Sequence, residues 1–172
     1  MNYFEFFGIP LSFDTDKKEL RQKFLSNSKK YHPDFHSMES EEVQAKILEQ
    51  STINNQAYKV LKEPESRMKY ILELKNMIGG EIKASLPQDF LFEMMEINEQ
   101  VMELQFEYNE LEHKRIKAEI DIREQKREES IKAVIENYVE GPGSEKDLEI
   151  IRDYYLESRY LKRLKENMQK LI

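Results

Sequence analysis

The sequence predicts an all-α protein, and three observations support this expectation. Only 5 Gly and 5 Pro occur among 172 residues, so few positions interrupt a helix. Glu, Lys, Leu and Ile fill long uninterrupted runs in which apolar residues recur at helical spacing. Hydrophobic residues make up 39% of the chain and charged residues 35%, a balance typical of helices that bury a narrow stripe and solvate a wide face.

Residues 1–75 have the pattern of a helical hairpin. The segment YFEFFG is a short apolar element stopped by Gly8. A longer helix starts near Asp16 and must end before Pro33, because the residue that precedes a proline is pushed out of the helical region. A third helix runs from about Glu41 to Lys62, and ESRMKYILELK is a short fourth helix. We expect the second and third helices to lie antiparallel, with a proline-containing loop at their tip.

A linker separates this hairpin from a second domain. Gly79 and Gly80 end a helical pattern, and Pro87 lies where a new helix can begin. We therefore expect a linker at 76–86 and an antiparallel three-helix bundle at 87–172. The segment EGPGSEKD is the turn before the last helix.

Each helix of the expected bundle has an apolar stripe. The first stripe alternates spacings of four and three: Phe90, Met94, Ile97, Val101, Leu104, Tyr108 and Leu111. The second, within 114–138, contains Ile116, Ile120, Ile131, Val134 and Tyr138. The third contains Ile150, Tyr154, Leu161, Leu164, Met168 and Leu171. We expect these stripes to pack on one another as the bundle core.

The composition argues against several classes of function. The chain has no cysteine, which excludes disulfides, thiolate zinc sites and a cysteine-ligated iron–sulfur cluster held by the chain itself. It has no apolar run of about 18 residues and no secretory signal pattern, so we expect a soluble cytoplasmic protein with no membrane partner. Residues 1–75 contain 12 basic and 12 acidic residues, so the net charge of −7 belongs to 76–172. An acidic half suits a protein partner better than nucleic acid.

Catalytic motifs are missing from the sequence. It has no glycine-rich phosphate loop, no G-x-S-x-G elbow and no H-E-x-x-H pair. His113 stands alone in a charged helix, where we expect it to be solvated. We expect no catalytic residue, no cofactor and no metal site.

The segment KKYHPDFHS offers a metal-site alternative. His32, Asp34 and His36 supply imidazole and carboxylate groups within five positions, and a metal-dependent hydrolase could use them. Against this, Pro33 stiffens the backbone between the first two, and no second cluster of ligands completes a coordination shell. Elemental analysis of freshly purified protein would test this alternative.

The same loop, taken with its neighbours, resembles the J domain of DnaJ-type co-chaperones. His32, Pro33 and Asp34 lie between a basic helix and an apolar one, and YFEFFGIP, LRQKFLSNSKKYHPD and INNQAYKVLKEPESRMKYIL follow the order of that family. A J domain followed by an acidic helical bundle of this length resembles the HscB family, co-chaperones of iron–sulfur cluster assembly. The segments RMKYILEL and FLFEMMEINEQ extend the resemblance over essentially the whole chain.

The resemblance implies two docking surfaces. In the family, a basic helix and the His-Pro-Asp loop bind a DnaK- or HscA-type chaperone and stimulate its ATP hydrolysis, so the co-chaperone itself is not an enzyme. In this sequence the matching residues are His32, Pro33, Asp34, Arg21, Lys23, Lys29 and Lys30. The surface that binds the iron–sulfur scaffold protein, of the IscU type, matches Leu91, Phe92, Met95, Glu96, Glu99, Glu103 and Tyr160.

The apolar pattern of the 87–111 region supports the second surface independently. Leu91, Phe92, Met95 and Met102 lie beside the stripe that is expected to be buried, and they exceed what one stripe needs. Methionine suits adaptable recognition. Three alternatives stay open: these side chains pack against the J domain or neighbouring helices, the lysines form an ordinary solvated face, or the bundle binds a client other than a cluster scaffold.

Overall fold

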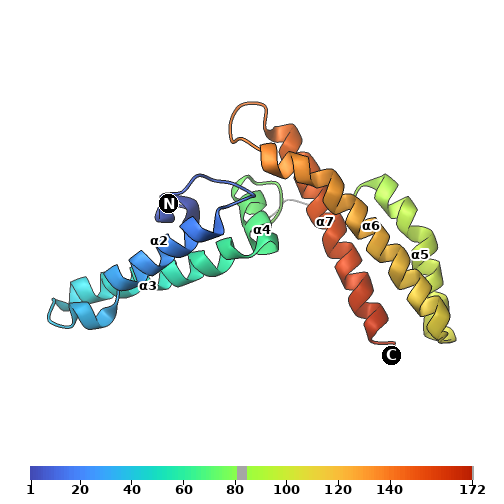
Figure 1. Cartoon of the computed structure of the whole chain (residues 1–172), viewed down its shortest axis with the longest axis horizontal. Helices are drawn as coiled ribbons and strands as arrows, with labels where there is room; N and C mark the ends of the chain where they lie inside the picture. Colours follow the sequence, from blue (N-terminus) through green and yellow to red (C-terminus); the bar gives the residue numbers. More distant parts are fainter. Residues whose placement is uncertain (81–84, 172) are drawn as a thin grey trace. The chain divides into compact units, whose positions relative to one another are not determined.

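A computed structural model describes residues 1–80 and 85–171 of the chain. Within these residues the chain forms seven α-helices, one 3-10 helix and no strand, which confirms the all-α prediction. The chain divides into two compact units, Met1–Ile71 and Leu72–Ile172 (Figure 1). None of the helices in the described part is both long and apolar enough to cross a membrane.

The first unit is built around a helical hairpin. Its elements are α1 (Tyr3–Phe7), α2 (Lys17–Lys30), η1 (Pro33–His36), α3 (Glu41–Lys62) and α4 (Pro64–Leu74), of which the last continues into the second unit. Helices α2 and α3 lie side by side and antiparallel, with η1 at the tip of the pair (Figure 1). The expected hairpin is confirmed.

The local sequence explains where these helices begin and end. Asp16 Oδ1 accepts hydrogen bonds from the backbone N–H groups of Lys18 (2.7 Å) and Glu19 (3.2 Å) and so caps α2. Gly8 ends α1 in the left-handed conformation, with a φ of 62°. Pro64 is the first residue of α4, a position where the missing N–H group of proline has no cost.

Aromatic and polar contacts join α2 to α3. The ring of Phe24 stacks on that of Tyr58, with centroids 4.1 Å apart. Asn54, which is buried in α3, donates from Nδ2 to the carbonyl of Phe24 (3.3 Å) and to Ser28 Oγ (3.1 Å). These contacts lie along the middle of the hairpin. The loop at its tip therefore connects two closely packed helices.

Arg67 connects three segments of the first unit. Its guanidinium is buried and donates from Nε to the carbonyl of Phe13 (3.0 Å) and from Nη1 to the carbonyl of Leu61 (2.6 Å). Burial lowers the pKa of Arg67, while the charges of Asp14 and Glu63 act in the opposite direction. Since arginine starts from so high a value, the side chain stays charged and keeps donating at neutral pH.

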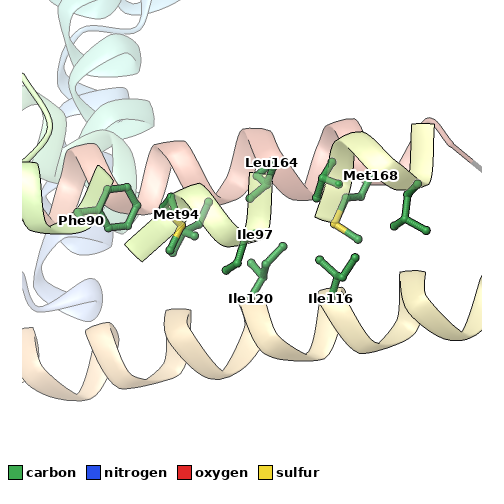
Figure 2. Packing of buried hydrophobic residues seen from close by; sticks show 10 residues of the cluster. Phe90, Met94, Ile97, Ile116, Ile120, Leu164 and Met168 are labelled. Atoms are coloured by element: carbon green, nitrogen blue, oxygen red, sulfur yellow. The ribbon is translucent and has the colours of Figure 1, made fainter. Parts of the chain in front are cut away.

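The second unit contains a three-helix bundle, as expected. Helices α5 (Gln88–Phe106), α6 (Glu110–Asn137) and α7 (Glu145–Gln169) run antiparallel in sequence order (Figure 1). Their buried stripes form one apolar core, shown in Figure 2: Phe90, Met94, Ile97, Val101, Leu104, Ile116, Ile120, Leu161, Leu164 and Met168. The expected linker, 76–86, includes residues 81–84, which lie outside the described part of the chain.

Some expected core positions are exposed. Tyr108 and Leu111 leave the core because α5 already ends at Phe106. On α7, Leu148, Ile151 and Tyr155 are buried, whereas Ile150 is exposed and Tyr154 only half-buried, so the real stripe is shifted by one position at this end.

His113 is buried, and the expectation that it would be solvated was wrong. Its Nε2 lies 3.2 Å from the carbonyl oxygen of Met168. This contact joins the start of α6 to the last turn of α7. His113 is therefore a structural residue of the bundle.

Arg127 of α6 holds α5 and α7 together. It donates from Nη2 to Glu93 on α5 (2.6 Å) and from Nε to Glu157 on α7 (2.7 Å). Its guanidinium also lies over the ring of Phe90, 4.9 Å from the centroid. Burial disfavours the charge, but the hydrogen bonds that Arg127 donates to Glu157 and Glu93 outweigh this effect and raise the pKa of Arg127. These interactions fix the face that α5 turns toward the core, and hence the face that it turns outward.

Candidate functional site

The His-Pro-Asp segment forms a tight turn between α2 and α3. His32 caps η1 and Pro33 is its first residue, so the fixed φ of proline starts the turn. The backbone N–H of Asp34 donates to His32 Nδ1 (3.3 Å), and that of Phe35 donates to the His32 carbonyl (3.1 Å). The His32 side chain is still 51% exposed and that of Asp34 86% exposed. The turn therefore presents an imidazole and a carboxylate to solvent from an ordered backbone.

Two side chains outside the motif attach this turn to both helices. His36 Nε2 lies 2.9 Å from the carbonyl of Lys30, the last residue of α2. Gln44 of α3 donates from Nε2 to the carbonyls of Ser37 (3.2 Å) and Glu39 (2.9 Å). Gln44 was not predicted from the sequence, because a single glutamine within a helix belongs to no motif.

The four basic residues expected to dock a chaperone are exposed, but they lie on two sides of α2. Arg21 and Lys29 are eight positions apart and share one side, whereas Lys23 and Lys30 are seven apart and share another. Arg21 also lines a groove of about 300 Å³ between α2 and α3, together with Lys17, Lys18, Leu20, Tyr58 and Lys62. The positive surface is thus broader than the predicted set, since it includes Lys17, Lys18 and Lys62.

Exposed apolar side chains flank the turn. Phe35 is 74% exposed, and the centroid of its ring lies 5.6 Å from the centroid of the His32 ring. A second hollow, of about 230 Å³, is lined by Pro33, His36, Gln44, Ala45, Ile47 and Leu48. These apolar neighbours of the motif were not predicted, although the aromatic residue directly after His-Pro-Asp is visible in the sequence.

The structure gives no support to the metal-dependent hydrolase. Across residues 1–80 and 85–171, no group of three or more His, Asp and Glu side chains is arranged to hold a metal ion. His36 Nε2 points to the Lys30 carbonyl, and His32 Nδ1 is engaged by the Asp34 N–H. The geometry of the loop is that of a backbone turn.

The predicted scaffold-binding residues of α5 lie on its outer side. Leu91, Phe92 and Met95 are exposed, and Met102 and Phe106 continue this surface along the helix. We call these five residues the α5 strip. Residues 91, 95, 102 and 106 are separated by one or two helical turns, so they share one side of α5. The carboxylates of Glu96, Glu99 and Glu103 are exposed beside the strip.

Tyr160, on α7, borders the α5 strip. Its ring packs edge-on against Phe90 with centroids 5.4 Å apart, and its hydroxyl accepts a hydrogen bond from Asn98 Nδ2 (2.6 Å). Asn98 lies about one turn from both Met95 and Met102 on α5. Tyr160 is half-buried, so it contributes mainly to the attachment of α5 to α7 and only in part to the outer surface.

Two family models match the chain in sequence order. The model described as the DnaJ domain matches residues 2–70, and the model described as the HSCB C-terminal oligomerisation domain matches residues 86–169. Together they include the His-Pro-Asp turn and all three helices of the bundle.

Curated relatives agree with these matches. The chain is 38% identical over 105 residues to the co-chaperone protein HscB homolog of Vibrio parahaemolyticus serotype O3:K6, an alignment that spans 60% of this chain and 61% of the relative. It is 32% identical over 106 residues to the co-chaperone protein HscB of Proteus mirabilis, spanning 61% of each. The alignments thus extend over less than two thirds of the relatives' length.

Solved structures are similar over nearly the whole chain. The crystal structure of human co-chaperone protein HscB has a TM-score of 0.69 at 26% identity, covering 98% of this chain and 81% of that one. Chaperone HscB from Vibrio cholerae has the same fold, with a TM-score of 0.64 at 23% identity and coverage of 99% and 96%. The chain thus matches a DnaJ domain at residues 2–70 and an HSCB C-terminal domain at residues 86–169, and it is similar to HscB co-chaperones in sequence and in fold.

Proposed function

We propose that the chain is an adaptor with two docking surfaces. One surface stimulates ATP hydrolysis by a DnaK- or HscA-type chaperone, and the other binds an IscU-type scaffold protein of iron–sulfur cluster assembly and delivers it to that chaperone. The observation that carries this proposal is the presence, in separate compact units, of an exposed His-Pro-Asp turn and an exposed apolar strip bordered by carboxylates.

The chaperone is engaged by the turn and the basic helix. His32 and Asp34 make the specific contact, and Pro33 lowers the entropy cost of binding because the turn is ordered beforehand. Arg21, Lys23, Lys29 and Lys30 speed the encounter with an acidic surface in a salt-dependent way. The chemistry of ATP hydrolysis takes place in the chaperone.

The scaffold is engaged by α5. Leu91, Phe92 and Met95 supply apolar area that the bundle core does not use, and the methionine adapts to the shape of the partner. Glu96, Glu99 and Glu103 set the register of the complex, since carboxylates at the border of an apolar contact favour one arrangement of partner charges. Tyr160 supports this surface from α7.

Coupling between the two activities arises from proximity. A chain that holds the scaffold and the chaperone at once raises the effective concentration of each for the other. No signal between the two units is needed for this effect.

Separate substitutions test the division of labour. We expect His32→Gln to abolish stimulation of ATP hydrolysis and to leave scaffold affinity unchanged, because the turn and α5 belong to different units. We expect Leu91→Ala combined with Phe92→Ala to weaken scaffold binding about tenfold or more, while stimulation without scaffold is retained. Ile122→Ala, an equally exposed apolar position on α6, is the matched control.

Two results would contradict the proposal. Loss of both activities in a folded His32→Gln protein would show that the surfaces are not separate. Unchanged scaffold affinity in the double α5 variant would remove the strip as the binding surface and leave a J-domain co-chaperone whose bundle binds another client.

A further inference from the structure

The end of the bundle where α5 turns into α6 has a groove beyond the predicted scaffold surface. Its volume is about 580 Å³, and it is lined by Gln100, Glu103, Leu104, Phe106, Glu107, Tyr108, Asn109, Glu112, Arg115 and Ile116. Leu104 and Ile116 are buried members of the bundle core. The groove therefore has apolar side chains of the core among its lining residues.

Phe106 and Tyr108 line this groove, and Leu111 follows Tyr108 by three positions in the sequence. Phe106, the last residue of α5, is 90% exposed, and Leu111 near the start of α6 is 76% exposed. Tyr108 lies between them in the sequence and is also exposed. Such a concentration of exposed apolar surface at one turn is typical of a contact site for another molecule.

The groove carries uncompensated negative charge. Glu103, Glu107 and Glu112 line it, and Arg115 is the cation among the lining residues. Arg115 is engaged by Glu112, with Nε 2.9 Å from Oε2, and this hydrogen bond raises the pKa of Arg115. Glu103 and Glu107 form no ion pair within the part of the chain that the structure describes. A ligand for this groove must therefore bring positive charge as well as apolar surface.

We propose that this α5–α6 end binds a basic amphipathic segment of the scaffold protein. An apolar side chain of that segment occupies the groove beside Leu104 and Ile116, and its Lys or Arg residues face Glu103 and Glu107. The inference rests on the proposed function and extends it. Glu103 belongs both to the predicted scaffold-binding surface and to the groove. Met102 and Phe106 extend the α5 strip to the groove, so one partner can contact the strip and the groove together.

Phe106 and Glu107 allow the inference to be tested without disturbing the fold. Phe106 is almost fully exposed, so its truncation leaves no cavity in the core. Glu107 lies just past the end of α5, where a lysine interacts favourably with the helix dipole. Glu149→Lys makes the same charge change at an exposed position near the start of α7, at the opposite end of the bundle, and is the matched control.

The measurement is the affinity of the full chain for a purified IscU-type scaffold at low salt and at about 0.3 M salt. We expect Phe106→Ala to weaken binding about fivefold or more at both salt concentrations. We expect Glu107→Lys to weaken binding severalfold at low salt and to flatten the salt dependence, because a charge at the border of the contact mainly affects association. Glu149→Lys should bind like the unmodified chain.

The other outcomes separate this inference from the proposed function. Normal binding by Phe106→Ala and Glu107→Lys, with weakened binding by the Leu91→Ala and Phe92→Ala protein, overturns the inference alone. Normal binding by all of these variants, or no binding by the unmodified chain, overturns both. Sedimentation of the chain alone provides a further test: a dimer that Phe106→Ala dissociates would assign the groove to a second copy and overturn the inference.

Discussion

Gln44 is the residue that attaches the His-Pro-Asp turn to α3. Gln44→Ala removes the donor to the carbonyls of Ser37 and Glu39. Because a net hydrogen bond is worth about 1 kcal/mol, a loosened turn should raise the concentration needed for half-maximal stimulation several-fold. A titration of the chain into a single-turnover ATPase assay with a DnaK-type chaperone measures this concentration.

Two control variants show whether the hydrogen bonds of Gln44 cause the change. Gln44→Glu keeps the size of the side chain but lacks the N–H donor, so it should behave like Gln44→Ala. Gln56→Ala makes the same truncation at an exposed position further along α3 and should have no effect. An unchanged half-maximal concentration in both Gln44 variants would show that the turn is ordered without this side chain.

Arg67 supports the first unit in the same way, through buried carbonyls. Arg67→Met preserves much of the apolar packing but leaves the carbonyls of Phe13 and Leu61 without their donor. Each unsatisfied buried acceptor costs about 1–3 kcal/mol, so we expect a loss of about 2–4 kcal/mol in the free energy of unfolding. Urea unfolding measures it, with Lys59→Met as an exposed control on α3. A loss no larger than that of the control would contradict this role.

At the scale of the helices, the attachment of α5 depends on Arg127. Arg127→Met removes the partner of Glu157, whose side chain is only 17% exposed, whereas Glu93 is open enough to be solvated. We expect the bundle to lose about 1–3 kcal/mol, mainly from the unpaired Glu157. A double-mutant cycle with Glu157→Gln should show that much of this loss disappears when both groups are changed. Additive losses would mean that the pair does not hold the helices together.

The helix pattern of α5 was predictable up to its end but not beyond. The alternation from Phe90 to Leu104 identified the buried face, because five positions repeat without a conflict. Tyr108 and Leu111 continued the pattern in sequence although α5 ends at Phe106. Asn109 marks the start of a new helix, and this was not recognised in the sequence. Its Oδ1 accepts hydrogen bonds from the N–H groups of Leu111 (2.9 Å) and Glu112 (3.1 Å) and so caps α6.

Contacts between segments that are distant in the sequence explain the other wrong predictions. Both Tyr154 and Tyr155 fit a helical stripe, and only packing against the neighbouring helices selects Tyr155. The carbonyl that engages His113 belongs to Met168, 55 positions away, so no local pattern shows that this histidine is buried. The same limit applies to the two sites. The His-Pro-Asp motif consists of adjacent residues and can be recognised in the sequence. The groove beside Leu104 and Ile116 forms only when α5 and α6 pack together.

For the whole molecule, the division into two units matches a division of charge. Residues 1–75 are neutral overall but concentrate cations on α2, and the net charge of −7 belongs to residues 76–172. The two units can therefore attract partner surfaces of opposite sign. This arrangement suits an adaptor that must bind two different proteins at once.

We propose that one chain links chaperone activation to scaffold delivery. The test is single-turnover ATP hydrolysis by a DnaK- or HscA-type chaperone, measured for the chaperone alone, with the chain, and with the chain and an IscU-type scaffold. We expect the chain to accelerate hydrolysis and the scaffold to accelerate it further, with both effects lost in His32→Gln. No acceleration by the chain, or an acceleration that is the same with and without scaffold, would contradict the claim.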